Sequence, residues 1–239
     1  MFYFLVEPLL NYNFLLIAAA VIPAVILMVK VYQADRLEKE SQALLWQLVK
    51  AGIFSSLIAM VAEKILNYLL ISFVDIGSTA YNVILYFVVV AVSEECAKYF
   101  MLKRYTWHSP EFNCLFDGVV YAVFVSLGFG LWENISYVLS YGFQTAVVRA
   151  VTAIPGHACF GVFMGVFYAF AKKQELAGNE GDSQRYRFFS LLAPVLLHGA
   201  YDYIASTTES SWFFIIFIAA LFSVSFALVN KTSKNDRYL

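Results

Sequence analysis

Apolar residues run through this chain in seven long stretches, separated by short polar connections. A stretch of about 17–25 apolar residues is long enough to cross the hydrocarbon core of a bilayer as an α-helix. The pattern predicts spanning helices near residues 13–30, 51–73, 81–102, 115–140, 148–171, 188–206 and 212–230. Residues 31–50 are expected to form a polar linker or an amphipathic surface helix. We therefore predict an all-α, polytopic transmembrane bundle in which residues 1–239 form a single membrane domain.

Lysine and arginine are distributed unevenly over the predicted connections. Of the 16 Lys and Arg residues, all but Lys64, Lys98 and Arg149 lie on one side of the membrane under this assignment. The connections near 74–80, 141–147 and 207–211 contain neither residue type. Because basic loops stay in the cytoplasm, we expect the N-terminus outside and the C-terminus inside a multi-pass protein of the cell (inner) membrane.

The composition agrees with a membrane environment. Hydrophobic residues make up 61% of the chain and charged residues 14%, whereas soluble domains have roughly 45–50% and 25%. The net charge of −1 gives no indication of a nucleic-acid partner. The lipid bilayer is therefore the expected surrounding of most of the chain.

Ionisable residues nevertheless lie inside five of the predicted spans. Each costs roughly 2.5–3.5 kcal/mol near the bilayer centre, so each needs a partner or a function. A rise of about 1.5 Å per residue from the cytoplasmic end places five of them in one slab about 11–21 Å deep: Glu94, Glu95, His157, His198 and Asp202. The same count puts Glu133 deeper, near 27 Å, and Asp117 near the inner surface.

The spacing of these residues indicates chemistry. Lys98 follows Glu94 by four residues and Glu95 by three, so it can offset either carboxylate on one helix face. Asp202 follows His198 by four residues and can orient its ring. Such a set indicates water activation, metal binding or proton transfer, with hydrolysis preferred. By contrast, Glu63 and Lys64 are expected to be a structural pair, and Asp117 a solvated or capping residue.

The ordered motifs resemble those of the PrsW family of intramembrane proteases over about residues 90–205. The resemblance rests on an EExxK run, a DGxxY entry to the next helix, a GFxxxEN element, an arginine before a Pro-Gly-His sequence, and an HGxYD ending. In this chain they are Glu94–Lys98, Asp117–Tyr121, Gly128–Asn134, Arg149 with Pro155–His157, and His198–Asp202. The family is related to the CAAX prenyl proteases and to bacteriocin-immunity-type membrane proteins.

The resemblance implies proteolysis within the membrane of a bacterial cell. By motif, Glu94 would be the general base and Glu95 its partner, while His157 would position the water. His198 and Asp202 would serve the oxyanion. Supporting roles would fall to Lys98, Glu133, Asn134 and Arg149. The implied partner is a single-pass membrane protein, such as an anti-sigma factor cut in regulated proteolysis.

Two alternatives to a metal-free protease remain at this point. Family members are described as metalloproteases, and His157, His198 and Glu94 would be able to hold Zn²⁺ with an open position for water. Because the chain has no HExxH sequence, we expect a glutamate-based mechanism without a cofactor. A proton-coupled transporter or channel is the alternative function, since Glu, His and Asp residues within spans also form proton relays.

Overall fold

The structure is a computed structural model that describes residues 2–207 and 211–239, with side chains from residue 13 onward in these ranges. The described residues form helices and connections, and their one β-feature is an isolated bridge between Cys114 and Tyr238. The prediction of an all-α bundle is confirmed. The helices are α1 (Phe2–Ala34), α2 (Gln42–Leu70), α3 (Thr79–Ile84), the π-helix η1 (Leu85–Val90), α4 (Ala91–Thr106), α5 (Asp117–Tyr141), α6 (Phe143–Val151), α7 (Ala153–Leu176), α8 (Glu180–Thr207) and α9 (Ser211–Lys234).

Six helical segments of the described chain are long and apolar enough to cross a membrane. They are Asn13–Ala34, Gln42–Leu70, Asp117–Tyr141, Phe143–Leu176, Glu180–Thr207 and Ser211–Lys234. The seventh predicted segment, 81–102, is also helical and consists of most of α3, η1 and α4. The π-helix η1 divides this segment, and the α-helices on its two sides, of 6 and 16 residues, are each too short to cross a membrane alone.

The connection between the first two long helices is shorter than predicted. Helix α1 continues to Ala34, and α2 begins at Gln42. Ser41 caps α2 by accepting a hydrogen bond from the Leu44 backbone N–H at 3.2 Å. The predicted linker over 31–50 is therefore reduced to residues 35–41, and the surface-helix interpretation of this region is wrong.

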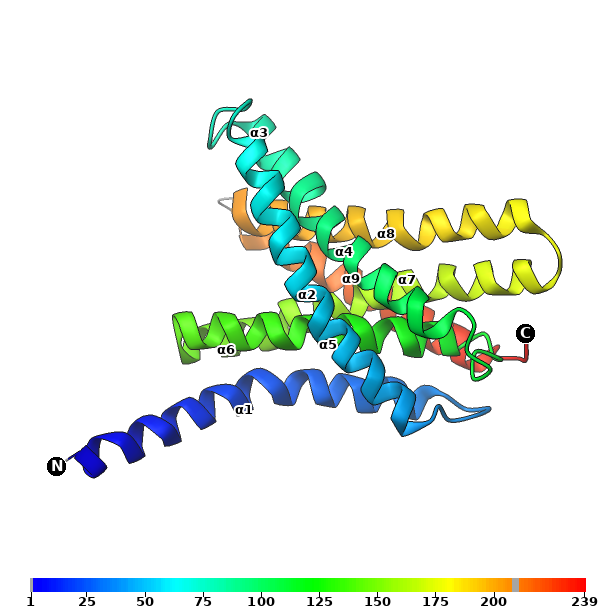
Figure 1. Ribbon diagram of the computed structural model, residues 1–239, viewed down its shortest axis with the longest axis horizontal. Coiled ribbons are helices and arrows are strands. Elements are labelled where there is room, and N and C mark those ends of the chain that lie inside the picture. The colour runs from blue at the N-terminus through cyan, green and yellow to red at the C-terminus, as the bar shows by residue number, and fades with distance from the viewer. Residues whose placement is uncertain (1, 208–210) are drawn as a thin grey trace.

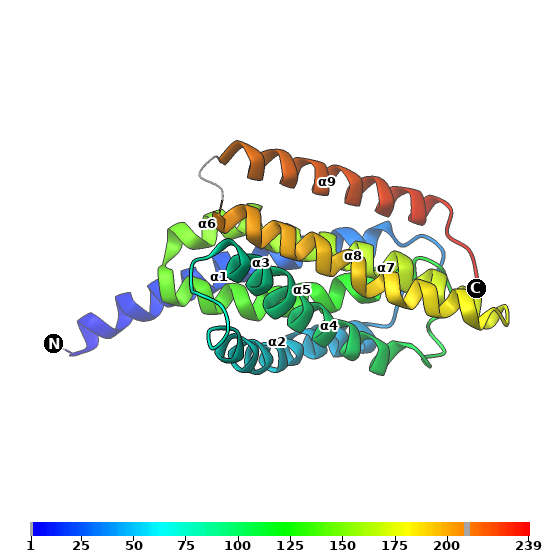
Figure 2. The same ribbon diagram turned by 90° about the horizontal axis from the view of Figure 1, so that it is seen from above.

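Figure 1 shows how the helices are arranged. Helices α5 and α7 lie side by side in the centre, and α2 and α4 cross them obliquely. A Cβ atom at Gly165 of α7 would lie only 2.4 Å from the Gly118 carbonyl oxygen of α5, so glycine is required at this close crossing. Figure 2 shows α9 on the outside of the bundle, where it contacts mainly α7 and α8.

One end of the bundle collects the basic connections. The connections 35–41, 107–116 and 177–179 and the C-terminus all lie at the right of Figure 1, and we call this the basic end. The α5–α6 turn, the end of α8 and the start of α9 lie at the opposite end, together with the start of α1. This division is the one that the distribution of Lys and Arg predicts.

Candidate active site

The glutamate pair lies on α4, directly after the π-helix η1. Glu95 is fully buried and Glu94 is 6% exposed. The ammonium of Lys98, also fully buried, lies 2.7 Å from Glu95 Oε1 and 3.1 Å from Glu94 Oε2. It also faces the Phe129 ring, 3.9 Å from its centroid. One buried cation thus offsets two adjacent carboxylates, as the spacing on one helix allows.

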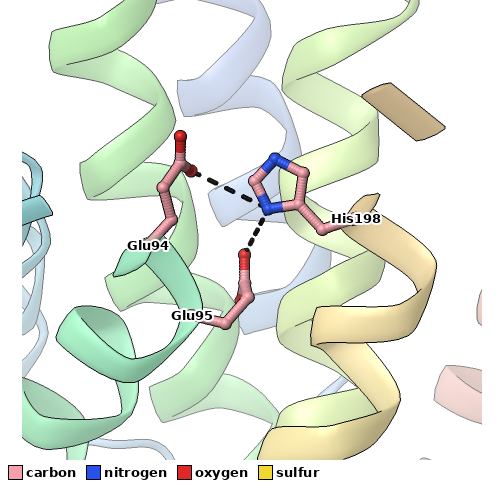
Figure 3. Close-up of side chains that lie close together, drawn as sticks. All are labelled: Glu94, Glu95 and His198. Carbon is pink, nitrogen blue, oxygen red and sulfur yellow. Dashed lines mark hydrogen bonds and ion pairs between the residues drawn. The ribbon is translucent and has the colours of Figure 1, made fainter. Parts of the chain in front are cut away.

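His198 reaches the same pair from α8. Figure 3 shows its ring pointing at both glutamates, with Nδ1 2.8 Å from Glu95 Oε1 and 3.8 Å from Glu94 Oε2. On the other side of the ring, Nε2 lies 3.4 Å from Asp202 Oδ2. Phe160 of α7 stacks on the imidazole with ring centroids 4.8 Å apart. A doubly protonated ring can therefore donate to a carboxylate from each nitrogen.

His157 of α7 also contacts Lys98, and its ring centroid lies 5.7 Å from that of His198. Its Nδ1 is 3.3 Å from the ammonium and its Nε2 is 2.7 Å from Glu133 Oε2. Since an ammonium group only donates, Nδ1 must accept, and the proton on Nε2 is donated to Glu133. The ring fits here because residue 130 is glycine: a Cβ there would lie 2.7 Å from His157 Cδ2.

Glu133 and Asn134 are held in turn by two other helices. Arg149 of α6 lies 3.0 Å from Glu133 Oε2, and its Nε donates to Asn134 Oδ1 at 2.9 Å. The Asn134 amide donates to the Ala20 carbonyl oxygen of α1 at 2.9 Å. Arg149 also stacks over Tyr137, 4.1 Å from the ring centroid. The supporting groups therefore tie α1, α5 and α6 to the histidine of α7.

A cavity of about 460 Å³ lies beside these carboxylates and imidazoles and is lined in part by them. Glu94 lies in its wall and Glu95 does not, so the two adjacent acids differ in their access to water. The remaining charged or imidazole side chains of the wall are Glu63, Glu133, Arg149, His157, His198 and Asp202. Tyr86, Trp132, Tyr137, Phe160 and Tyr201 add aromatic surface.

The structure brings together the residues to which the sequence gave catalytic and supporting roles, although the depth count misplaced one of them; Asp117 of the DGxxY motif lies apart from them. Glu133 was expected about 6 Å deeper than His157, yet their side chains are in contact at 2.7 Å. Helix inclination and the reach of a glutamate side chain account for the difference. Glu63, interpreted from sequence as a structural residue, lines the cavity, while Lys64 is exposed. The sequence signal that could have assigned Glu63 to the site was the position of this carboxylate inside a predicted span.

The donor set for a metal also differs from the predicted one. Ligand atoms of Glu94, Glu95 and His198 lie within 4.8 Å of one another. The predicted set contained His157 in place of Glu95. Both ring nitrogens of His157 already face Lys98 and Glu133, so this histidine does not join the group.

Spanning helices that enclose carboxylates, imidazoles and a cavity fit a membrane-embedded hydrolytic enzyme, and the same residue types also occur in proton relays, so the comparisons with known proteins decide between the two. A family model described as "PrsW family intramembrane metalloprotease" matches residues 40–229. The chain belongs to this family, and it is an intramembrane protease and a multi-pass membrane protein.

Individual relatives agree with this assignment. The "Protease PrsW" of Geobacillus kaustophilus is 32% identical over 212 residues, which cover 87% of this chain and 88% of the relative. The protein of the same name from Halalkalibacterium halodurans is 31% identical over 94% of this chain and 100% of its own length. The one from Bacillus subtilis is 30% identical over 84% and 87% of the two chains. No solved structure matches the chain.

Proposed function

We propose that this enzyme hydrolyses peptide bonds of single-pass membrane proteins, of the anti-sigma-factor type, with a water molecule activated by Glu94. The observation that carries the proposal is the unequal placement of the two glutamates. The Glu94 carboxylate lies in the cavity wall, whereas Glu95 is enclosed and contacts both Lys98 and His198. Glu94 is therefore the carboxylate that water and substrate reach, and Glu95 holds the two cationic groups beside it.

The reaction would proceed by general base catalysis. Glu94 takes a proton from water while the water oxygen attacks the carbonyl carbon of the scissile peptide bond. The protonated Glu94 then gives this proton to the leaving nitrogen as the C–N bond breaks. Reaction of the carbonyl places negative charge on its oxygen, which needs a hydrogen-bond donor nearby.

His198 is the donor that fits this role. Its Nδ1 is held by Glu95 at 2.8 Å, while its contact from Nε2 to Asp202 is longer, at 3.4 Å. A substrate oxygen entering the cavity can replace this weaker contact and receive the Nε2 proton. His157 contacts Lys98 and, held by Glu133, would keep the ammonium and the water position aligned.

The family description raises the question of a metal ion. Two carboxylates and one imidazole within 4.8 Å of one another, from Glu94, Glu95 and His198, have the donor types of catalytic zinc sites. These three residues would hold the ion, which would supply an activated water molecule at neutral pH. We favour the mechanism without it, because the Lys98 ammonium already offsets the charge of both carboxylates at 2.7 and 3.1 Å.

We infer that substrate and water enter from the extracytoplasmic side of the cell membrane. Beyond the catalytic groups, the cavity wall continues along α2, α5 and α8 to Glu63, Tyr137 and Ser206. These positions lie toward the helix ends whose connections contain no Lys or Arg. The positive-inside rule assigns that side to the exterior. Counted along their span, Glu94 and Glu95 lie closer to the basic end of the bundle. The cavity nevertheless extends from Glu94 toward the opposite end.

The proposal is tested with purified protein reconstituted in liposomes with a single-pass membrane substrate. We expect Glu94→Gln to lower the cleavage rate by about 10²–10⁴-fold without loss of folding, because the general base is removed. Glu180→Gln is the matched control, since that carboxylate is exposed at the start of α8. Full activity in the Glu94 variant would refute the role of this residue.

The same preparation separates the two mechanisms. Metal content is measured in active protein and compared with the cleavage rate before and after chelation. Activity that persists in metal-free protein supports the glutamate mechanism. Loss of activity on chelation, restored in step with the return of Zn²⁺, would replace it by the metal-dependent one.

A further inference from the structure

A second group of buried carboxylates lies at the basic end of the bundle. Asp35 and Glu40 belong to the connection between α1 and α2, and Asp117 is the first residue of α5. One carboxylate oxygen from each lies within 4.8 Å of the other two. Asp117 precedes Glu133 by 16 residues on α5, a rise of about 24 Å, so this group is distinct from the active site.

These carboxylates are enclosed, and several of their oxygens lack partners. Asp35 is 2% exposed, Asp117 1% and Glu40 6%. Among the described residues, no hydrogen bond of good geometry reaches either oxygen of Asp35 or Oδ1 of Asp117, although the Arg36 backbone N–H acts on Asp35 and the Glu40 carboxyl on Asp117. The other oxygen of Asp117 accepts from the backbone N–H groups of Asn113 and Cys114 at 2.9 and 2.6 Å. Glu40 Oε2 accepts from the Tyr121 hydroxyl at 2.7 Å.

The protein supplies little positive charge at this point. Lys39 acts on Asp35, but its ammonium donates to the backbone carbonyls of Tyr32 and Asp35. Asp236, whose charge also acts on Asp35, adds a further carboxylate with a buried oxygen lacking a partner. Burial raises the pKa of Asp35 to about 6. Burial and the neighbouring Asp117 carboxylate raise the pKa of Glu40 to about 9. An arrangement of this kind needs a counter-ion.

We propose that Asp35, Glu40 and Asp117 bind a hard divalent cation, Mg²⁺ or Ca²⁺, at the basic end of the bundle. Carboxylate oxygens completed by water molecules are the ligands that both ions prefer. The three donors include no imidazole or thiolate, the ligand types that favour zinc and other softer metals. The oxygens of Asp35 accept no hydrogen bond of good geometry, so an ion would displace at most the weak interaction with the Arg36 backbone N–H.

The cation would join parts of the chain that are distant in sequence. It would link the α1–α2 connection to the start of α5, the helix that carries Glu133 and Asn134. The C-terminal segment lies beside it, since Ser233 donates to the Ala34 carbonyl and the Leu115 N–H donates to the Arg237 carbonyl at 3.1 Å. A bound ion would therefore stabilise the whole basic end of the bundle.

The test uses purified full-length protein in detergent, first treated with chelator and then supplied with Mg²⁺ or Ca²⁺. We expect either ion near saturation to raise the Tm of the wild type by roughly 5–10 °C. Asp35→Asn keeps the shape of the side chain and breaks no hydrogen bond of good geometry, so this variant is expected to lose the shift. In chelator it should melt above the wild type, because one uncompensated charge has been removed.

The matched control is Asp182→Asn, which removes an exposed carboxylate at the same end of the bundle and should behave like the wild type. An ion held by Glu94, Glu95 and His198 would still stabilise the Asp35 variant, so an equal shift in that variant refutes the site. Glu40→Gln serves as the second variant if Asp35→Asn does not fold.

A direct count of bound ions completes the test. Titration with Mn²⁺, followed by electron paramagnetic resonance, should show an ion in the wild type that Mg²⁺ displaces and that the Asp35 or Glu40 variant lacks. The rival arrangement is a proton shared between Glu40 and Asp117. Absence of bound Mn²⁺, together with a Tm that divalent cations do not change, would favour that proton and overturn the proposal.

Discussion

Helix α5 carries a buried carboxylate at its first residue and a half-buried one in its outer half, and the protein compensates their charge in different ways. Near its outer end, Glu133 contacts Arg149 and His157, and the neighbouring Glu94–Glu95 pair contacts Lys98 and His198. At its first residue, Asp117 receives two backbone N–H groups but keeps one oxygen without a partner. The active site thus carries its own cations, whereas the basic end leaves room for one from solution.

The cavity end and the basic end of the bundle should also differ completely in how well a reagent added outside the cell can reach them. In a variant lacking the native cysteines, Ser206→Cys places a thiol in the cavity wall on an exposed residue. We expect a membrane-impermeant maleimide to label it fully in intact cells. Gly181→Cys, where an added side chain meets nothing within 4 Å, should be labelled only after the cells are opened. The reverse pattern would invert the assigned orientation.

The next largest effect is expected from removing the cation shared by the two glutamates. Lys98→Met leaves two buried carboxylates without their ammonium, which should cost roughly 3–5 kcal/mol in the free energy of unfolding and abolish cleavage. Adding Glu95→Gln should recover much of the stability and none of the activity. Unfolding in detergent and the liposome assay measure the two quantities. Unchanged stability in the single variant would show that Lys98 does not neutralise the pair.

A smaller effect is expected from the positioning residue Arg149. Arg149→Lys keeps the positive charge but cannot contact Glu133 and donate to Asn134 together, as the guanidinium does at 3.0 and 2.9 Å. We expect kcat to fall by about 10–100-fold with KM nearly unchanged. Arg185→Lys is the control, because its ion pair with Asp182 is exposed. A rise in KM alone would instead indicate that Arg149 binds the substrate.

The sequence was sufficient for the fold class and for most of the ionisable residues that the structure gathers around the cavity, for a physical reason. Apolar length predicts a spanning helix, and an ionisable residue inside one is rare enough to indicate function. Rotation and inclination of the helices do not follow from length. This is why the contact between His157 and Glu133, and the enclosure of Glu95 beside an accessible Glu94, appear first in the structure.

The carboxylates of the basic end were missed for a related reason. Asp35 and Glu40 lie in a stretch that also contains Arg36, Glu38 and Lys39, a composition typical of a solvated linker. Their burial depends on how tightly residues 35–41 pack against α5 and the C-terminal segment, a tertiary effect. Asp35, Glu40 and Asp117 lie in or beside connections that the sequence places on the same side of the membrane. This shared location was the sequence signal for their proximity.

The glycine at position 130 has a consequence for the motion of the active site. Because the His157 ring lies directly against the backbone of α5, no intervening side chain can rotate to make room for it. The imidazole is therefore blocked by main chain on its α5 side, and a displacement of the ring in that direction would require α5 and α7 to move apart, a movement slower than a change of side-chain rotamer.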